Sequence, residues 1–353
     1  MDERPTLGVV GAGAAGASAA YALRDRDVDV ALFEKSRGLC GRAATRRRDG
    51  RRYDYGANYL KSDDEAVSEL VTERLPSDGL VEAAGPVWTF DADGTISAGR
   101  DADDSKWTWE AGITQLAKRL LAETDATVHR ETRVGRIERM ADGGDSEAGW
   151  RLFDADGEHL GAFDALLLTP PAPQTAELLA ATDWADDRRE QLHDAVADVS
   201  YRPILTAVAG YERRLDRPYY ALVNTDDAHD VGWVAREECK PGHVPDDESL
   251  LVIQMSPAWS RDRLEDDPEA WAADAVAATA DLFDESWLAD PAWTDHQRWR
   301  YALPNEGLAA GAADPAAEAG LFVAGDWVAG QARLHAAIRS GLDVGDRIGE
   351  YLG

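Results

Sequence analysis

The feature that most constrains this chain is a glycine-rich turn near the N-terminus, between a short apolar run and a small-residue stretch. Gly11, Gly13 and Gly16 form the pattern Gly-x-Gly-x-x-Gly directly after the run 6–10, and the Ala- and Leu-rich stretch 14–24 follows. Gly11 permits a tight turn, Gly13 lets a pyrophosphate approach the backbone, and Gly16 lets helix and strand pack closely. The start of the predicted helix offers N–H groups and a positive dipole end to phosphate.

An acidic residue completes this pattern at the end of the next apolar run. Glu34 follows the predicted strand 29–33 and lies 18 residues after Gly16. A carboxylate at this place accepts hydrogen bonds from ribose hydroxyls and disfavours a 2′-phosphate. Strand, turn, helix, strand and acid in this order predict a βαβ dinucleotide-binding unit, and therefore an α/β fold.

The net charge of the chain limits the kinds of partner that it can bind. The 353 residues include 67 acidic and 37 basic ones, which gives a net charge of −30, and only five of the basic residues are lysines. So acidic a surface repels nucleic acid and anionic membranes, and we expect neither as a partner. The 44% hydrophobic residues are enough for a core. An acidic, lysine-poor chain of this kind is typical of proteins from a high-salt cytoplasm, so the composition predicts a source such as a halophilic archaeon.

Cysteine and histidine usage limits the chemistry further. Two cysteines, Cys40 and Cys239, predict no disulfide framework and fit a reducing, cytoplasmic location. The seven histidines form no HxH or HxxxH pair, so the sequence predicts no metal site. No run approaches the ~18 strongly apolar residues of a membrane-spanning helix.

Both ends of the chain resemble one family. After Glu34, the pair Gly41-Arg42 and the run Asp54-Tyr-Gly-Ala57 resemble the signature of FAD-dependent flavoproteins of the amine oxidase superfamily. The tail runs 320–327 and 333–341 resemble that superfamily's second FAD motif and last helix. The usual form of the first signature is Gly-Gly-Arg, whereas this chain has Cys40 before Gly41.

The middle of the chain is similar to the renalase family. The runs 200–203, 240–242, 259–260 and 296–302 follow one another as they do in that family, so the resemblance spans essentially the whole chain. His335 stands where the family usually has Glu, and His243 where it has Arg in Lys-Pro-Gly-Arg. We expect both departures to lie on the substrate side.

The resemblance implies a glutathione-reductase-like FAD/NAD(P)-binding Rossmann domain with a second, mixed α+β substrate domain. We expect residues 1–60, 100–171 and 305–353 in the discontinuous FAD domain, and residues 61–99 and 172–304 in the substrate domain. FAD is expected to be non-covalent, because the superfamily's covalent attachment uses a cysteine near the C-terminus and the last one here is Cys239. The implied FAD-binding residues are Gly11, Ala12, Gly13, Ala15, Gly16, Glu34, Lys35, Gly41, Arg42, Asn58, Tyr59, Val134, Gly325, Asp326, Leu334 and Ala337.

The resemblance also implies an activity. The enzyme would pass hydride from a dihydronicotinamide, an isomer of NAD(P)H, to the flavin and then to O₂, giving hydrogen peroxide. Its partners would be a small-molecule substrate, such as a pyridine dinucleotide, and O₂. The candidate catalytic residues are Trp299 and Tyr301, as a wall for the substrate, and His296. An amine oxidase or desaturase is the alternative enzyme, and a non-catalytic FAD-binding redox sensor is the alternative of another class.

An arginine-rich stretch at residues 42–52 stands out in so acidic a chain. We expect a solvated loop whose arginines pair with nearby acids. In the alternative, one or two of these arginines attract an anionic substrate near the flavin.

Overall fold

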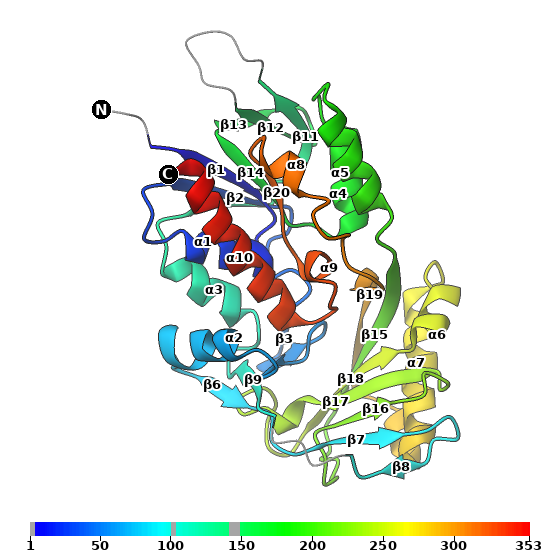
Figure 1. Cartoon of the computed structure of the whole chain (residues 1–353). Helices are drawn as coiled ribbons and strands as arrows, with labels where there is room; N and C mark the ends of the chain where they lie inside the picture. The colour runs from blue at the N-terminus through cyan, green and yellow to red at the C-terminus, as the bar shows by residue number, and fades with distance from the viewer. Residues whose placement is uncertain (1–3, 100–103, 141–148) are drawn as a thin grey trace. The chain divides into compact units, whose positions relative to one another are not determined.

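The computed structural model describes residues 4–99, 104–140 and 149–353, and the chain divides into two compact units (Figure 1). Unit 1 comprises residues 1–41, 116–200 and 304–353, and unit 2 comprises residues 42–115 and 201–303. Each unit is therefore assembled from stretches that lie far apart in the sequence.

These bounds differ from the expected domains. Unit 1 ends its first segment at residue 41 instead of 60, resumes at 116 instead of 100, and continues to 200 instead of 171. Residues 42–60 go with unit 2, where the Asp54 N–H donates to Glu237. Residues 172–200 go with unit 1, where the Asp183 N–H donates to Ile137 O at 2.8 Å. The expected boundary at residue 100 lies outside the described residues.

The core of unit 1 is a five-stranded sheet in the order β10-β2-β1-β14-β20, in which every neighbouring pair is parallel. Strands β1, β14 and β20 are short, apolar and buried, because both faces of a parallel sheet are covered. An antiparallel sheet β11-β12-β13 accompanies it. The elements of this unit are β1 Thr6–Val10, α1 Ala14–Ala22, β2 Asp29–Glu34, α3 Gln115–Ala122, β10 Thr127–Arg130, β11 Val134–Arg139, β12 Trp150–Asp154, β13 His159–Phe163, β14 Ala165–Leu168, α4 Ala172–Ala180, α5 Asp187–Ala197, α8 Asp314–Ala317, β20 Leu321–Val323, α9 Asp326–Ala329 and α10 Leu334–Leu352.

Helices α1 and α10 lie side by side within unit 1 (Figure 1). A Cβ on Gly341 would stand 2.2 Å from Ala15 O, and one on Gly345 would stand 2.8 Å from Ala19 O. Only glycine at these two positions allows the helix backbones to come so close. The first and last helices of the chain therefore support each other, although more than 300 residues separate their sequences.

Unit 2 is built on a seven-stranded sheet in the order β19-β15-β18-β17-β16-β7-β8. Helix α7 covers it with the buried side chains of Trp271, Ala275 and Phe283, and smaller sheets β3-β4 and β5-β9-β6 complete the unit. Its elements are β3 Thr45–Arg48, β4 Arg51–Asp54, β5 Leu60–Lys61, α2 Glu65–Glu69, a π-helical turn η1 Leu70–Arg74, β6 Leu80–Glu82, β7 Val87–Phe90, β8 Ile96–Ser97, β9 Lys106–Trp109, β15 Tyr201–Tyr211, β16 Ala221–Asn224, β17 Val231–Arg236, η2 Glu237–Cys239, β18 Ser249–Met255, α6 Pro257–Asp262, α7 Pro268–Phe283, η3 Ser286–Ala289 and β19 Trp293–Pro304.

The local sequence patterns agree with these elements where the pattern is strong. The predicted strand 6–10 is β1, the predicted helix in 14–24 is α1, and the predicted strand 29–33 lies within β2; a turn at Asp93-Gly94 joins β7 to β8. Gly94 takes the positive φ of +78° that such a turn needs. In the described part of the chain, no helix is long and apolar enough to cross a membrane.

Candidate functional site

The glycine-rich turn of unit 1 has the geometry of a phosphate cradle. Gly11 takes φ +97°, and a Cβ on Gly16 would stand 2.2 Å from Gly11 O, so both positions require glycine. A Cβ on Gly13, in contrast, would meet no atom within 4 Å. The open side of the turn therefore lies at Gly13, at the start of α1, where backbone N–H groups and the helix dipole favour a pyrophosphate.

Glu34 ends β2 and points back to this turn. Its Oε2 accepts from Ala12 N at 3.0 Å and its Oε1 accepts from Ser36 N at 2.8 Å, while the residue is only 7% exposed. Two backbone donors fix the carboxylate, and each oxygen has further lone-pair capacity for a ribose hydroxyl. The next residue, Lys35, contacts Gln174 Oε1 at 3.3 Å on the exposed side.

The Cys40-Gly41 pair also contacts the turn. The Cys40 N–H donates to Ala12 O at 2.9 Å, and Gly41 lies so that a Cβ on it would stand 3.5 Å from Gly13 Cα. Both residues have positive φ, +75° at Cys40 and +57° at Gly41. Cys40 therefore adopts the left-handed backbone of the glycine it replaces, at a cost of about 1–2 kcal/mol for an L-residue.

The remaining predicted FAD-binding residues of unit 1 lie at the ends of elements. Gly325 and the buried Asp326 follow β20, and the Gly325 N–H donates to Ser340 Oγ on α10 at 3.0 Å. Leu334 and Ala337 lie in the first turn of α10, and Val134 is the first residue of β11. Gly325, Asp326, Leu334 and Ala337 therefore lie at the end of a parallel strand or at a helix N-terminus, where such folds bind a dinucleotide, whereas Val134 begins an antiparallel strand.

In unit 2, the stretch Asp54–Tyr59, hereafter the flavin-side segment, carries the run predicted to lie beside the flavin. The Ala57 N–H donates to Arg42 O at 3.0 Å, and a Cβ on Gly56 would stand 1.9 Å from that oxygen. Glycine is therefore required at position 56. Arg42 itself donates from its guanidinium to Ala302 O in β19 at 2.8 Å.

Side chains of the seven-stranded sheet also form hydrogen bonds with the flavin-side segment. Gly56 O accepts from Gln254 Nε2 at 2.7 Å and from Asn58 Nδ2 at 2.9 Å. Asn58 Oδ1 in turn accepts from Trp233 Nε1 at 3.2 Å, and the Tyr59 ring lies 6.1 Å from the Trp233 ring. The segment thus presents aromatic side chains on a backbone fixed by hydrogen bonds.

An aromatic pair joins the segment to β19. The rings of Trp299 and Tyr55 stack with centroids 5.2 Å apart and an interplanar angle of 22°, and Trp299 Nε1 donates to Tyr55 O at 3.1 Å. The guanidinium of Arg46 lies 4.3 Å from the other ring of the pair, Tyr55. Trp299 is therefore held by both stacking and a hydrogen bond.

The three predicted catalytic residues have different surroundings. Tyr301 packs its ring against Tyr201, with centroids 5.7 Å apart. His296 packs against Trp271 of α7, with centroids 5.6 Å apart. His296 and Trp299 thus contact different parts of unit 2, the helix and the flavin-side segment.

The arginine-rich stretch forms the hairpin β3-β4 rather than a loop. Arg46 pairs with Asp295 at 2.9 Å and Arg51 pairs with Glu248. Arg47 and Arg48 donate to the carbonyls of Ala111 and Thr294. Pairing with nearby acids, as expected, holds for Arg46 and Arg51, and these contacts pin the hairpin inside unit 2.

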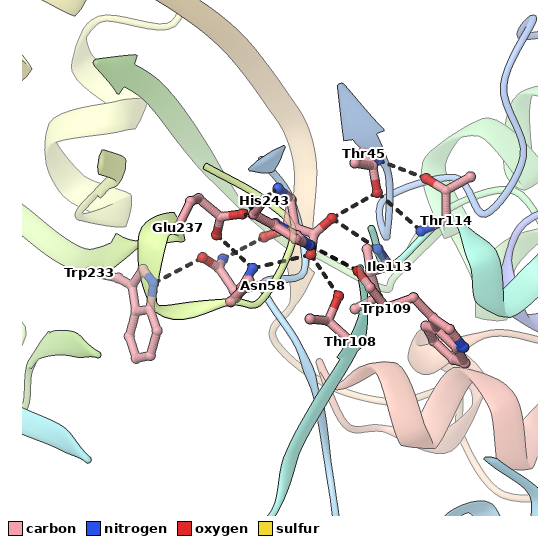
Figure 2. Close-up of polar contacts among 12 residues, drawn as sticks. Thr45, Asn58, Thr108, Trp109, Ile113, Thr114, Trp233, Glu237 and His243 are labelled. Atoms are coloured by element: carbon pink, nitrogen blue, oxygen red, sulfur yellow. Dashed lines mark hydrogen bonds and ion pairs between the residues drawn. The ribbon is translucent and has the colours of Figure 1, made fainter. Parts of the chain in front are cut away.

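The structure also brings together four charged side chains that the sequence spacing did not indicate, hereafter the charge quartet: Asp54, Glu237, Lys240 and His243. All four are completely buried. Lys240 Nζ lies 2.6 Å from Glu237 Oε1 and 3.1 Å from Asp54 Oδ2. His243 Nδ1 lies 2.8 Å from Glu237 Oε2, and its Nε2 lies 2.9 Å from Trp109 O (Figure 2).

Asp54 is the most heavily bonded member. Its Oδ1 accepts from Thr45 Oγ1 at 2.7 Å and from Ile113 N at 2.9 Å, and its Oδ2 accepts from Thr108 Oγ1 at 2.9 Å. Burial opposes ionisation, but the charges of Lys240 and His243 outweigh it and lower the pKa of Asp54. For Lys240, burial disfavours the ammonium, yet the neighbouring carboxylates raise its pKa.

His243 was expected on the substrate side. It lies in the turn after η2 and inside the quartet, where its ring nitrogens contact Glu237 and the Trp109 carbonyl. The other departure from the family pattern, His335, is the second residue of α10 in unit 1 and is 8% exposed.

Comparison with known proteins places these motifs in a family. A model of the NAD(P)-binding Rossmann-like domain matches residues 9–74, and a model of the flavin-containing amine oxidoreductases matches residues 82–349, most of the chain. The chain belongs to the flavin-containing amine oxidoreductase family. It is therefore an FAD-dependent oxidoreductase, with a Rossmann-like domain in a mixed α/β fold, which sets aside the non-catalytic sensor.

Solved structures share this fold at low identity. A provisionally assigned protoporphyrinogen oxidase from Exiguobacterium sp. 255-15 has TM-score 0.76 and 16% identity over 99% of both chains. A cyclohexylamine oxidase from Brevibacterium oxydans IH-35A has TM-score 0.72 and 16% identity over 99% of this chain and 100% of that one. A putrescine oxidase has TM-score 0.71 and 15% identity over 98% and 99% of the two chains.

Proposed function

We propose that this flavoenzyme removes hydride from a flat dihydronicotinamide ring, an isomer of NAD(P)H, and passes the electrons to O₂ to give hydrogen peroxide. The observation that carries the proposal is the Trp299–Tyr55 stack beside Gly56. A Cβ on Gly56 would stand 3.1 Å from the Trp299 ring, so the ring reaches the flavin-side segment directly. A planar wall of this kind suits a planar substrate.

The charges around this wall favour a substrate with a neutral ring and disfavour a substrate with an ammonium group. Asp54 and Glu237 are paired with Lys240 and His243, and Asp295 is paired with Arg46. Carboxylates that already have a cation attract a second one weakly. Hydride removal from a dihydropyridine also needs no general base.

Membership of the family supports the second candidate, oxidation of an amine.

The residues present fit FAD. Bound FAD supplies the acceptor for hydride and returns the electrons to a second acceptor. The turn at Gly13 and the start of α1 would hold the pyrophosphate, and Glu34 would hold a ribose. We propose non-covalent binding: Cys40 is buried beside the turn, and burial raises the pKa of Cys239 to about 11, which keeps that thiol protonated and a poor nucleophile at neutral pH.

The test is anaerobic mixing of the purified yellow protein with a panel of dihydronicotinamide isomers and amines, followed by flavin absorbance. We expect rapid bleaching by an isomeric dihydronicotinamide and peroxide formation when air is admitted. Bleaching by amines alone would replace the proposal with the second candidate. Release of FMN, or of no flavin, on denaturation would overturn the cofactor assignment.

Replacement of the wall residue tests the site itself. Trp299→Ala is expected to slow flavin reduction at saturating substrate by about tenfold, because the substrate loses its orientation. FAD content should stay near that of the wild type, since the turn at Gly13 is untouched. Trp107→Ala on β9, where the indole contacts Glu82, is the control and should leave the rate within about twofold. Equal slowing by both variants would show that Trp299 acts only through folding.

A further inference from the structure

The hydrogen bonds of the charge quartet fix where its protons lie. Trp109 O is a carbonyl and can only accept, so His243 Nε2, at 2.9 Å, carries a proton. Glu237 Oε2 faces His243 Nδ1 at 2.8 Å and also accepts from Asp54 N at 3.1 Å, while Oε1 faces the Lys240 ammonium at 2.6 Å. The backbone N–H at Oε2 and the ammonium at Oε1 stabilise Glu237 as an ionised carboxylate, which can only accept, so the Nδ1 of His243 is the donor in its contact with Oε2.

An imidazole that donates from both nitrogens is an imidazolium. The quartet then holds two anions, Asp54 and Glu237, and two cations, Lys240 and His243. Its charges cancel, which is the condition under which four ions can be buried together. A neutral His243 would leave one buried negative charge without a partner.

The same arrangement leaves no vacancy for a metal ion. One carboxylate oxygen each from Asp54 and Glu237 and one nitrogen of His243 lie within 4.8 Å of one another, close enough to share a cation. The Lys240 ammonium already lies between the two carboxylates, and an imidazolium has no lone pair to offer a metal.

The quartet is attached to the flavin-side segment at its first residue. Asp54 is bonded through its backbone N–H to Glu237 and through its side chain to Thr45, Thr108, Ile113 and Lys240. Within the next two positions come Tyr55 O, which accepts from Trp299, and Gly56 O, which accepts from Gln254. A shift of Asp54 would therefore be transmitted to the backbone atoms that orient the aromatic wall.

We propose that the charge quartet, with His243 as an imidazolium, is the device that positions the flavin-side segment for reaction. Its members are positioning residues, and this inference rests on the proposed function of that segment. The quartet acts by holding Asp54 from two sides, so that Tyr55, Gly56 and Trp299 keep one arrangement when substrate enters.

The first test removes one hydrogen bond to Asp54 without changing side-chain shape. Thr108→Val deletes the 2.9 Å bond from Thr108 Oγ1. The matched control is Thr279→Val in α7, an equally buried threonine that donates to Ala275 O at 2.8 Å, outside the site. We expect Thr108→Val to slow flavin reduction at saturating substrate about tenfold with an unchanged KM, and Thr279→Val to leave it within about twofold.

The flavin absorbance and circular dichroism spectra of both variants are recorded as well, because they need no substrate. A changed spectrum in Thr108→Val but not in Thr279→Val supports positioning even if dihydronicotinamides prove not to be substrates. Equal melting temperatures, spectra and rates in the two variants would overturn it. The proposed function fails separately, when the wild type is not reduced by any dihydronicotinamide.

The second test measures directly whether each ring nitrogen of His243 carries a proton. Nitrogen NMR of the holoenzyme labelled with ¹⁵N-histidine reports whether each ring nitrogen carries a proton. The His243 signal is assigned by its loss in His243→Gln, or, if that variant does not fold, by elimination with single variants of the other histidines. We expect protons on both nitrogens at neutral pH. A bare ring nitrogen on His243 would overturn the charge assignment and with it the proposal.

Discussion

At the scale of single residues, Glu34 is a buried carboxylate held by two backbone hydrogen bonds. Ala12 N and Ser36 N donate to this carboxylate, which we propose binds a ribose of FAD. Glu34→Ala is expected to weaken FAD binding by ~1.5–3 kcal/mol, the worth of hydrogen bonds to a charged group. Equilibrium titration of the apoprotein with FAD measures this. Full FAD occupancy of the variant at low FAD concentration would refute the ribose role.

At the same scale, the surroundings of Asp54 lead to a prediction about how the stability of the fold depends on pH. Its folded pKa is lowered because the charges of Lys240 and His243 outweigh burial. Its contribution to stability is therefore present above the unfolded value of about 3.9 and is lost as pH falls through the lower folded value. Asp54→Asn should be less stable than the wild type at neutral pH, and the gap should narrow in acid. Urea unfolding at several pH values measures the gap; Asp93→Asn, in the exposed β7-β8 turn, should show none.

At the scale of elements, α10 and α1 place two helix N-termini in one unit. Glycines on α10 allow the close packing on α1, and Ala337 lies in the first turn of α10. The positive end of a helix stabilises negative charge, such as that of a reduced flavin. Ala337→Asp is expected to lower the FAD reduction potential, as measured by redox titration. If the variant binds FAD with an unmoved potential, α10 does not face the flavin.

At the scale of the whole molecule, the charge excess decides the response to salt. The 67 acidic residues outnumber the 37 basic ones, and at ~0.01 M ionic strength the Debye length of ~30 Å lets them repel across a whole unit. At ~1 M salt that length is ~3 Å, so the folded state gains. We expect the melting temperature to rise steadily with KCl. A melting temperature that stays constant would contradict a high-salt origin.

The sequence alone determined the features that depend on neighbours along the chain. One such feature is the turn from Gly11 to Gly16, with the strand before it and Glu34 after it. These parts lie within about 30 residues of one another, so the spacing of glycines and apolar residues is enough to predict them. The expected strand 6–10 is β1, and the expected helix in 14–24 is α1. The family resemblance, which rests on such motifs, was confirmed at the level of the superfamily.

Only the tertiary structure decided which distant charges meet. Asp54 and Lys240 lie 186 positions apart, and no periodicity relates them, yet β4 and the turn after β17 bring them to 3.1 Å. His243 looks in the sequence like one more loop residue, whereas its burial requires both ring nitrogens to have hydrogen-bonding partners, which are Glu237 and Trp109 O. The physical reason is that burial makes an unpaired charge costly, and burial is a property of the folded chain, not of the order of its residues.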